Sequence, residues 1–218
     1  MPDVTRPALH DISVLVRPST PEWPGDVPFS CGWTSRIADG AAVNLSRTGG
    51  SPHVGTHADA PLHVHDGWAA SDALPLDAFV GPALVMDVTG APLGTLALDA
   101  DDPRFAGVER LLLRTGCTTA GGMFPATWPV IDPALATRLA GRGLRLLGVD
   151  APSVDERESK SLAVHHALFA GGAFVLENLD LRDVAPGRYE LLALPLRLHG
   201  LDAAPVRAVL RREGGDQV

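Results

Sequence analysis

The sequence contains few cysteines: its 218 residues include only Cys31 and Cys117, which lie far apart and form no C-x-x-C pattern. This excludes a disulfide framework and a thiolate zinc site, and it favours a reducing compartment. No apolar run approaches the roughly 18 residues that a membrane-spanning helix needs. The first residues, Met1-Pro-Asp-Val-Thr-Arg6, show no signal peptide. We therefore expect a cytoplasmic protein that does not enter a membrane.

Positive charge is also scarce. The 18 lysines and arginines stand against 26 aspartates and glutamates, which gives a formal net charge of −8. Nucleic acids and anionic membranes attract clustered lysine and arginine, so neither is expected as a partner. Hydrophobic residues make up 45% and charged residues 20% of the chain, an ordinary globular composition. The length predicts a single domain over residues 1–218 with a substantial core.

Several catalytic motifs are missing. No serine lies in a G-x-S-x-G pattern, and the P-loop, G-x-G-x-x-G and H-E-x-x-H patterns are absent. These absences leave the nucleophile elbow of α/β-hydrolases, the common nucleotide-binding loops and the zincin site without support. Activation of water by a metal is the hydrolytic mechanism that stays open.

Histidine, in contrast, is concentrated in residues 51–65, Ser-Pro-His-Val-Gly-Thr-His-Ala-Asp-Ala-Pro-Leu-His-Val-His, which hold four of the eight histidines. These histidines and Asp59 all fall on odd positions. Pro61 disfavours a helix through its effect on the preceding residue, so we expect an extended segment with alternate residues on one face. His57 and Asp59 then stand side by side, roughly 6.5–7 Å apart. Gly55 can bend the backbone and fold His53 toward them.

Two imidazoles and a carboxylate at this spacing suit a divalent metal with mixed nitrogen and oxygen ligands. A single histidine is more often a hydrogen-bonded core residue or an ordinary surface residue. Four histidines and an aspartate, all at odd positions within such a short segment, favour a metal site instead. His65 is the member of the set that we expect to be incidental.

Ligand-type residues gather again at His165, His166 and Glu177. A helix over 161–170, capped by Ser161 and ended by Gly171-Gly172, precedes a strand over 173–179, and this arrangement can bring both groups to one end of a sheet. Glu177 lies in an otherwise apolar strand, so it must be paired or coordinated. An ion pair with an arginine is the alternative for Glu177, and an exposed helix surface is the alternative for either histidine.

The two groups together suggest a dinuclear site bridged by Asp59. Two metals about 3.5–4 Å apart would polarise a carbonyl and lower the pKa of a shared water. His63 then stays free for proton transfer, to which an imidazole is well suited.

Patterning along the rest of the chain predicts an α/β class, with a dominant mixed sheet and short helices. Trp23, in the proline-dense loop 18–26, either caps the core or forms an aromatic wall for a flat substrate. Residues 115–131 are uncharged and predict a loop of the kind that often forms a lid. The polar tail from Glu213 is expected to fray. Strands are predicted at 11–16, 44–46, 83–88, 110–115, 144–149, 173–179, 189–194 and 205–211 (a helix being the alternative for the last), helices at 133–140 and 161–170, and a short helix or turn at 74–81.

The segment His53-Val-Gly-Thr-His-Ala-Asp-Ala-Pro-Leu-His63 resembles the H-x-G-T-H-x-D-x-P-x-H signature of the cyclase superfamily of metal-dependent hydrolases. The chain is most similar to the kynurenine formamidase branch, over nearly its whole length. Five stretches narrow the resemblance from the whole superfamily to this branch, namely 21–26, 148–155, 159–162, 164–166 and 176–179. The resemblance implies a swivelling β/β/α fold, with a mixed sheet or barrel and a few helices, that forms a homodimer.

The resemblance also implies residue roles. His53, His57 and Asp59 would bind a first zinc ion, and Asp59 would bridge to a second zinc ion completed by His165 and Glu177. His165 is preferred over His166 for its twelve-residue distance from Glu177. Mn²⁺ or another divalent metal could replace zinc. His63 would be the general acid/base, Trp23 would contact an aromatic substrate, and the segment Cys117–Thr127 matches the family pattern least.

The implied activity is hydrolysis of N-formyl-L-kynurenine to L-kynurenine and formate, a step of tryptophan degradation. The alternative within the superfamily is an isatin-hydrolase-like enzyme that acts on another aryl or cyclic amide. A silent metal- or ligand-binding protein is the alternative from a different class. His63 and Glu177 argue against it, because structural binding needs no free proton-transfer group.

Overall fold

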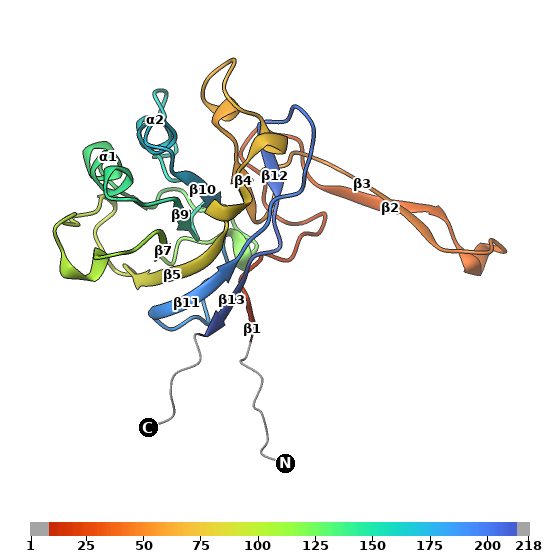
Figure 1. Cartoon of the computed structure of the whole chain (residues 1–218). Coiled ribbons are helices and arrows are strands. Elements are labelled where there is room, and N and C mark those ends of the chain that lie inside the picture. The colour runs from red at the N-terminus through yellow and green to blue at the C-terminus, as the bar shows by residue number, and fades with distance from the viewer. Residues whose placement is uncertain (1–8, 213–218) are drawn as a thin grey trace, which may run out of the picture.

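A nine-stranded sheet forms the centre of the computed structural model, which describes residues 9–212 (Figure 1). The strand order is β1-β13-β11-β5-β7-β9-β10-β4-β12. Strands β5, β7, β9 and β10 run parallel to their neighbours within that group, and the strands on either side are antiparallel. The sheet is therefore mixed. It curls into a half-barrel, and helices α1 and α2 lie on one side of it, which confirms the predicted α/β class.

The elements have the following bounds. The strands of the main sheet are β1 Leu9–Asp11, β4 His57–Asp59, β5 Val80–Asp87, β7 Arg110–Arg114, β9 Leu146–Val149, β10 Phe174–Glu177, β11 Gly187–Leu192, β12 Ala203–Pro205 and β13 Val209–Arg212. Two small sheets pair β2 Ser30–Ser35 with β3 Leu45–Gly49, and β6 Gly94–Thr95 with β8 Pro129–Val130. The helices are α1 Pro133–Gly141 and α2 Ala163–Ala170, with 3-10 turns at Ile37–Asp39, Pro61–His63, Ser71–Ala73, Leu76–Ala78, Pro103–Phe105 and Thr119–Gly121.

Two apolar clusters form on the two faces of the central strands, because neighbouring residues of a strand point to opposite faces. On β7, Leu111 and Leu113 join the cluster beneath α1 and α2, whereas Leu112 between them joins the cluster on the other face. All three are at most 1% exposed. The central strands are covered on both sides, which explains why they read as continuous apolar runs.

Most predicted elements are present, with boundaries shifted by a few residues. The predicted short helix or turn at 74–81 is the 3-10 turn Leu76–Ala78, and the predicted strand at 205–211 divides into β12 and β13. Helix α1 begins at Pro133 as predicted, and the Asp132 carboxylate accepts a hydrogen bond from the Ala134 N–H at 2.7 Å. The tail from Glu213, expected to fray, lies outside the described residues.

The predicted opening strand at 11–16 is wrong. Strand β1 ends at Asp11, and beyond it only an isolated bridge joins Ser13 to Leu179. Side chains intercept the backbone donors that a strand would use: the Val14 N–H donates to Thr56 Oγ1, and the Arg17 N–H donates to Thr20 Oγ1, both at 2.9 Å. Side-chain acceptors of this kind compete with a sheet ladder.

The histidine stretch is extended only over β4. Pro61 begins a 3-10 turn instead of continuing the strand, and the His63 N–H donates to the Ala60 carbonyl at 2.9 Å. Proline is well tolerated at the first helical position, where its missing N–H has no partner to lose. His63 therefore reaches the site from a turn, not from the same strand face as His57.

Strands β2 and β3 form an arm that projects away from the main sheet (Figure 1). The segment 44–46, predicted as a strand, lies at the start of β3; the sequence patterning did not indicate β2. Nothing helical among residues 9–212 has the length and hydrophobicity needed to cross a membrane.

Candidate metal centre

Strand β4 carries the first ligand-type residues into the middle of the molecule. It lies between β10 and β12, and the register pairs Glu177 with His57. The side chains of His57, Asp59 and Glu177 are at most 5% exposed. His57 Nε2 lies 3.3 Å from Asp59 Oδ1 and 3.6 Å from Glu177 Oε2. The sheet register thus gathers an imidazole and two carboxylates in one buried place.

Gly55 supplies the expected bend that brings His53 to the same place. Its φ of 75° lies in the left-handed region, and a Cβ there would approach Val16 Cγ2 to 2.5 Å. Only glycine adopts this conformation without strain. After the bend, His53 Nδ1 lies 3.1 Å from Asp59 Oδ1 and 3.1 Å from His57 Nε2.

Helix α2 contributes His165 from the far half of the chain. His165 is 1% exposed, and its Nε2 lies 3.1 Å from Asp59 Oδ2 and 3.4 Å from Glu177 Oε1. Ser161 does not cap this helix, contrary to the sequence prediction. Instead, the Asp155 carboxylate accepts hydrogen bonds from the backbone N–H groups of Val164 and His165, at 3.0 and 3.1 Å.

The other histidines of the two motifs lie outside this cluster. His166 packs edge-on against Trp68, with ring centroids 5.8 Å apart. His65 stacks on the same ring at 4.6 Å and is exposed, in agreement with the expectation that it is incidental. The proposed arginine partner of Glu177 is also wrong: in the described part of the chain, the ion-pair partners of Glu177 are His57 and His165.

Each of the three clustered histidines has one ring nitrogen directed toward the cluster (the inner nitrogen) and one directed away from it (the outer nitrogen). Hydrogen bonds to the outer nitrogens fix the orientation of the three rings. His57 Nδ1 lies 2.9 Å from the Gly55 carbonyl, His165 Nδ1 lies 2.7 Å from Asp155 Oδ2, and His53 Nε2 lies 2.9 Å from Asp202 Oδ2. Carbonyl and carboxylate oxygens only accept hydrogen bonds, so each of these nitrogens carries the hydrogen. In a neutral imidazole the inner nitrogen then holds a lone pair, and all three lone pairs point toward Asp59 or its neighbours.

This arrangement fits a bound cation. The inner nitrogens of His53 and His57 face each other at 3.1 Å, and that of His165 faces two carboxylate oxygens. Asp59 Oδ1 is buried and lacks a hydrogen-bond partner within residues 9–212. Facing lone pairs and an unpaired buried oxygen are costly unless a positive charge lies between them. Outer-nitrogen hydrogen bonds to oxygen acceptors are typical of histidines that ligate metals.

The charges of the cluster favour a cation in the same way. Burial alone would lower the pKa of His53, but the carboxylates of Asp202 and Asp59 would bind the protonated imidazole, and this attraction outweighs burial and raises the pKa to about 10. Burial also opposes the charged form of His165, yet Asp155, Asp59 and Glu177 hold its pKa well above the usual range. Burial would raise the pKa of Asp59, and the surrounding histidines hold it well below the usual range. The carboxylates therefore stabilise positive charge here, as protons or as metal ions.

His63 and Asp202 lie beside the cluster. His63 Nδ1 lies 3.2 Å from Asp202 Oδ2, and its ring centroid is 4.6 Å from that of His53 and 5.7 Å from that of His165. His63, Asp59 and His165 each offer an atom within 4.8 Å of the other two. The sequence analysis missed Asp202, because a lone aspartate in Leu201-Asp-Ala203 carries no pattern. Its position ahead of a strand that pairs with β4 becomes visible only in the fold.

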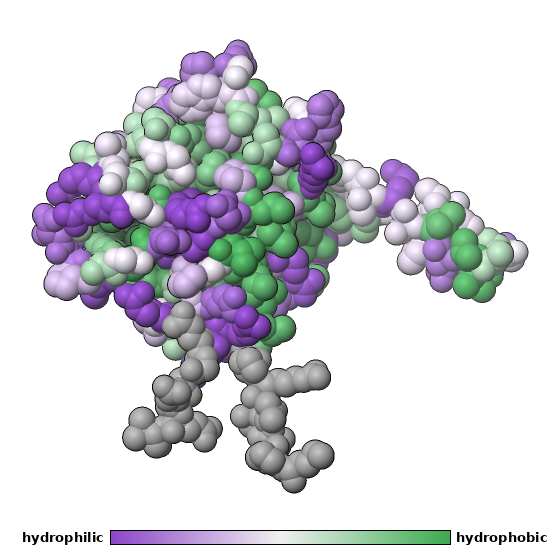
Figure 2. Space-filling model, in the orientation of Figure 1, coloured by the Kyte–Doolittle hydropathy of each residue, from purple (hydrophilic) through white to green (hydrophobic). Residues whose placement is uncertain are grey.

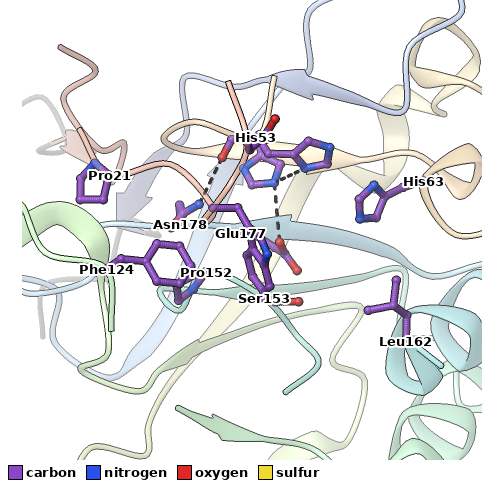
Figure 3. Close-up of a pocket in the computed structure, with 12 residues that line it drawn as sticks. Pro21, His53, His63, Phe124, Pro152, Ser153, Leu162, Glu177 and Asn178 are labelled. Carbon is purple, nitrogen blue, oxygen red and sulfur yellow. Dashed lines mark hydrogen bonds and ion pairs between the residues drawn. The ribbon is translucent and has the colours of Figure 1, made fainter. Parts of the chain in front are cut away.

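A pocket of about 290 Å³ opens onto the cluster (Figure 3). His53, His63 and Glu177 face the same space as the apolar side chains of Phe124 and Leu162. The full lining consists of Pro21, Trp23, Asp26, His53, His57, His63, Phe124, Pro152, Ser153, Leu162, Glu177 and Asn178.

Aromatic rings form the wall of this pocket opposite the histidines. Trp23 is 36% exposed and packs edge-to-face on Phe124 and Trp128, at centroid distances of 5.4 and 6.0 Å. The Trp23 residue lines the pocket, whereas Trp128 is 1% exposed and belongs to the core. Phe124 comes from the segment Cys117–Thr127, so this segment shapes the pocket.

Comparison with known proteins identifies the family of this chain. The model of the Cyclase family, described as "Putative cyclase", matches residues 10–156. The chain therefore belongs to the cyclase family. It is 47% identical to the kynurenine formamidase of Salinibacter ruber over 210 residues, which cover 94% of this chain and 97% of the relative. At this identity and coverage, the chain is a hydrolase.

Solved structures share the fold. One, described as a potential metal-dependent hydrolase with cyclase activity, is 29% identical, with a TM-score of 0.77, and the match covers 94% of this chain and 98% of the other. Isatin hydrolase A from Ralstonia solanacearum is 23% identical, with a TM-score of 0.79, and the match covers 94% of this chain and 92% of the other. At that identity, the likeness to the isatin hydrolase concerns the fold alone.

Proposed function

We propose that this chain hydrolyses N-formyl-L-kynurenine to L-kynurenine and formate, a step of tryptophan degradation. The observation that carries the proposal is the set of three inward-facing histidines around Asp59, placed at the floor of a pocket whose wall is aromatic. The 47% identity to a kynurenine formamidase supports the same substrate. A formylated arylamine has a flat ring for the wall and a carbonyl for the floor.

The residues present fit two divalent ions, for which we propose zinc, with Mn²⁺ as a possible substitute. His53, His57 and Asp59 would hold one ion, and Asp59, His165 and Glu177 would hold the other. When bound, the ions would polarise the formyl carbonyl and lower the pKa of a water molecule.

The chain's own side chains would supply orientation and proton transfer. Water adds its oxygen to the formyl carbon, the bond from that carbon to the aniline nitrogen breaks, and formate and the free arylamine result. His63, at the edge of the cluster and in the pocket wall, would deliver the proton that the departing nitrogen needs. Trp23 and Phe124 would hold the aromatic ring, so that the carbonyl points toward the histidines.

The test is to measure loss of N-formylkynurenine absorbance together with formate release by the purified protein, before and after chelation and after zinc is returned. Turnover that disappears with the chelator and returns with zinc is the expected result. A protein that binds zinc but leaves N-formylkynurenine intact would overturn the substrate. Isatin is the informative second substrate, because isatin hydrolase A shares the fold.

We also propose that the chain forms a homodimer in the cytoplasm and that the β2–β3 arm makes the contact. Trp33, Ile37, Val43 and Leu45 on the arm are each between 51% and 57% exposed. Figure 2 shows hydrophobic surface at the far end of the arm. A two-stranded hairpin without a partner is marginally stable in water, and a second copy would cover these side chains.

Sedimentation of Ile37→Asp tests the arm. The unchanged protein is expected to sediment at twice the chain mass of 22.8 kDa, and the variant at the mass of one chain. Leu93→Asp is the matched control, since Leu93 is 63% exposed on the main body, and it should leave the dimer intact. A dimer that persists in Ile37→Asp would contradict the proposed contact.

A further inference from the structure

We propose that Asp202 is a positioning residue: one of its carboxylate oxygens fixes the orientation and tautomer of His63 and, through His53, joins the acid/base residue to the candidate metal centre. This inference rests on the proposed function for the role of His63. Neither the histidine signature nor the second ligand group contains Asp202.

The backbone holds Asp202 in place relative to the cluster. Its carbonyl accepts a hydrogen bond from the Ala60 N–H at 2.8 Å, directly after β4. The next residue, Ala203, begins β12 and pairs with Asp59. The carbonyl of the preceding residue, Leu201, accepts a hydrogen bond from the Ser71 N–H at 2.8 Å. The position of Asp202 is therefore set by the same strand that carries His57 and Asp59.

One carboxylate oxygen of Asp202 accepts hydrogen bonds from two histidines. Oδ2 lies 2.9 Å from His53 Nε2 and 3.2 Å from His63 Nδ1. An ionised carboxylate only accepts hydrogen bonds, so both nitrogens donate to it. His63 thus carries a hydrogen on Nδ1, and its Nε2 is the nitrogen that can take up or release a proton. His53 likewise keeps its inner Nδ1 available toward Asp59.

His63 needs such a partner more than the other histidines do. It lies on a 3-10 turn, its side chain is 28% exposed, and in the described chain its ring makes no hydrogen bond other than the one to Asp202. Without that bond, the ring could turn about its side-chain torsions and present either nitrogen to the pocket. A proton donor must stay within hydrogen-bond reach of its target in one tautomer, so loss of Asp202 would mainly slow the proton-transfer step.

The contact between Asp202 Oδ2 and His63 Nδ1 has the geometry of catalytic triads, in which a carboxylate orients a catalytic imidazole. Because Asp202 does not reach the reacting atoms itself, it acts through His63.

The kinetic test compares Asp202→Asn with the unchanged enzyme at saturating zinc. Hydrogen-bond partners of this kind typically contribute about 10- to 100-fold to activity, so kcat for N-formylkynurenine should fall by that factor while KM changes little. Asp72→Asn is the matched control, because it removes another aspartate–histidine hydrogen bond, the 2.8 Å contact to His199, away from the pocket. Two zinc ions per chain in all three proteins would show that the loss does not come from missing metal.

Two further comparisons separate positioning from a general defect. Phenyl formate releases a phenolate that can depart without a proton, so Asp202→Asn should lose less activity on it than on N-formylkynurenine. In the His63→Ala background, adding Asp202→Asn should cost no further activity, because the two residues act as a unit. A wild-type kcat in Asp202→Asn, or a full additional loss in the double variant, would overturn the proposal.

A nitrogen NMR measurement tests the same point without substrate. In zinc-loaded protein with ¹⁵N-labelled histidine, the signal absent from His63→Ala identifies His63, and it should report hydrogen on Nδ1. In Asp202→Asn, this tautomer should give way to a mixture, and an unchanged tautomer would overturn the proposal. If the unchanged enzyme fails to hydrolyse N-formylkynurenine, the proposed function falls, while this spectrum still decides the role of Asp202.

Discussion

The Asp155 carboxylate holds His165 at two points. Its Oδ2 lies 3.1 Å from the backbone nitrogen of His165 and 2.7 Å from the imidazole Nδ1. The first contact caps helix α2, and the second sets which ring nitrogen faces Asp59. One side chain thus fixes both where the helix begins and how its histidine points.

Replacing Asp155 with alanine should therefore weaken the fold and the metal site together. Loss of the helix cap and of a buried acceptor should lower the free energy of unfolding by about 2 kcal/mol. Zinc affinity should fall about 10- to 100-fold, because His165 loses its orienting partner. Urea unfolding and a zinc titration measure the two effects. Asp132→Ala, which removes the cap of α1, should cost about 1 kcal/mol and leave zinc affinity unchanged. Equal zinc affinity in both variants would contradict the link.

The two adjacent histidines of α2, His165 and His166, should differ in their contribution to metal binding. His165→Ala should lose one of the two zinc ions and most of its turnover, because its ring faces Asp59 and Glu177. His166→Ala should keep both ions, because its ring packs on Trp68. Metal analysis after dialysis gives the answer, and loss of metal from the His166 variant would reverse the assignment.

His63→Ala should keep both metal ions and lose about 10²- to 10⁴-fold in kcat, the range that a general acid/base contributes. His199→Ala serves as the control: His199 is 97% exposed, pairs with Asp72 and lies outside the pocket lining. Its kcat should equal that of the unchanged enzyme. A His63 variant with unchanged turnover would remove His63 from the mechanism.

Trp23→Ala should raise KM for N-formylkynurenine about tenfold, equal to about 1.4 kcal/mol of aromatic contact, with a smaller change in kcat. Trp23→Phe keeps a ring against Phe124 and should lie close to the unchanged enzyme. Steady-state kinetics on both variants tests this. An unchanged KM in Trp23→Ala would mean that the wall does not contact the substrate.

Acid should destabilise the fold through Asp87. Its hydrogen bond to Arg114 lowers the pKa of this carboxyl from its ordinary 3.8 to about 2. A group whose folded pKa is depressed contributes stability above its unfolded pKa, and the contribution is lost as the pH falls through the folded value. The measurement uses protein from which a chelator has removed the metal. As the pH falls from 4 to 2, the free energy of unfolding should decrease less steeply in Asp87→Asn than in the unchanged chain. Equal slopes would contradict this contribution.

Sequence patterning was most informative where the chemistry lies close together along the chain. Two-residue spacing placed His57 beside Asp59 on β4, and a glycine before them marked the bend. A carboxylate in an apolar strand pointed to Glu177, and that side chain indeed lies between two histidines. In each case, a residue type was out of place for its local structure, and the structure shows what it contacts.

Patterning failed where a contact depends on chain segments that are far apart. Asp202 meets His63 only because β12 pairs with β4, and a lone aspartate before a strand gives no hint of this. The strand predicted at 11–16 does not form beyond Asp11, because side-chain hydroxyl groups accept the backbone hydrogen bonds. One of them is the Thr56 hydroxyl, which lies in the histidine stretch and accepts from the Val14 N–H. Strand β2 escaped notice because both of its faces are largely exposed, so no alternation marks it.

The aromatic wall and the histidine cluster belong to different parts of the chain. The cluster stands on strands, a helix and the backbone pairing around them, whereas Trp23 and Phe124 come from two connecting segments that hold none of the candidate ligands. Substitutions in those segments can therefore reshape what enters the pocket without disturbing the groups that react with it. This division makes Trp23 and Phe124 the natural positions at which to change the substrate preference of the enzyme.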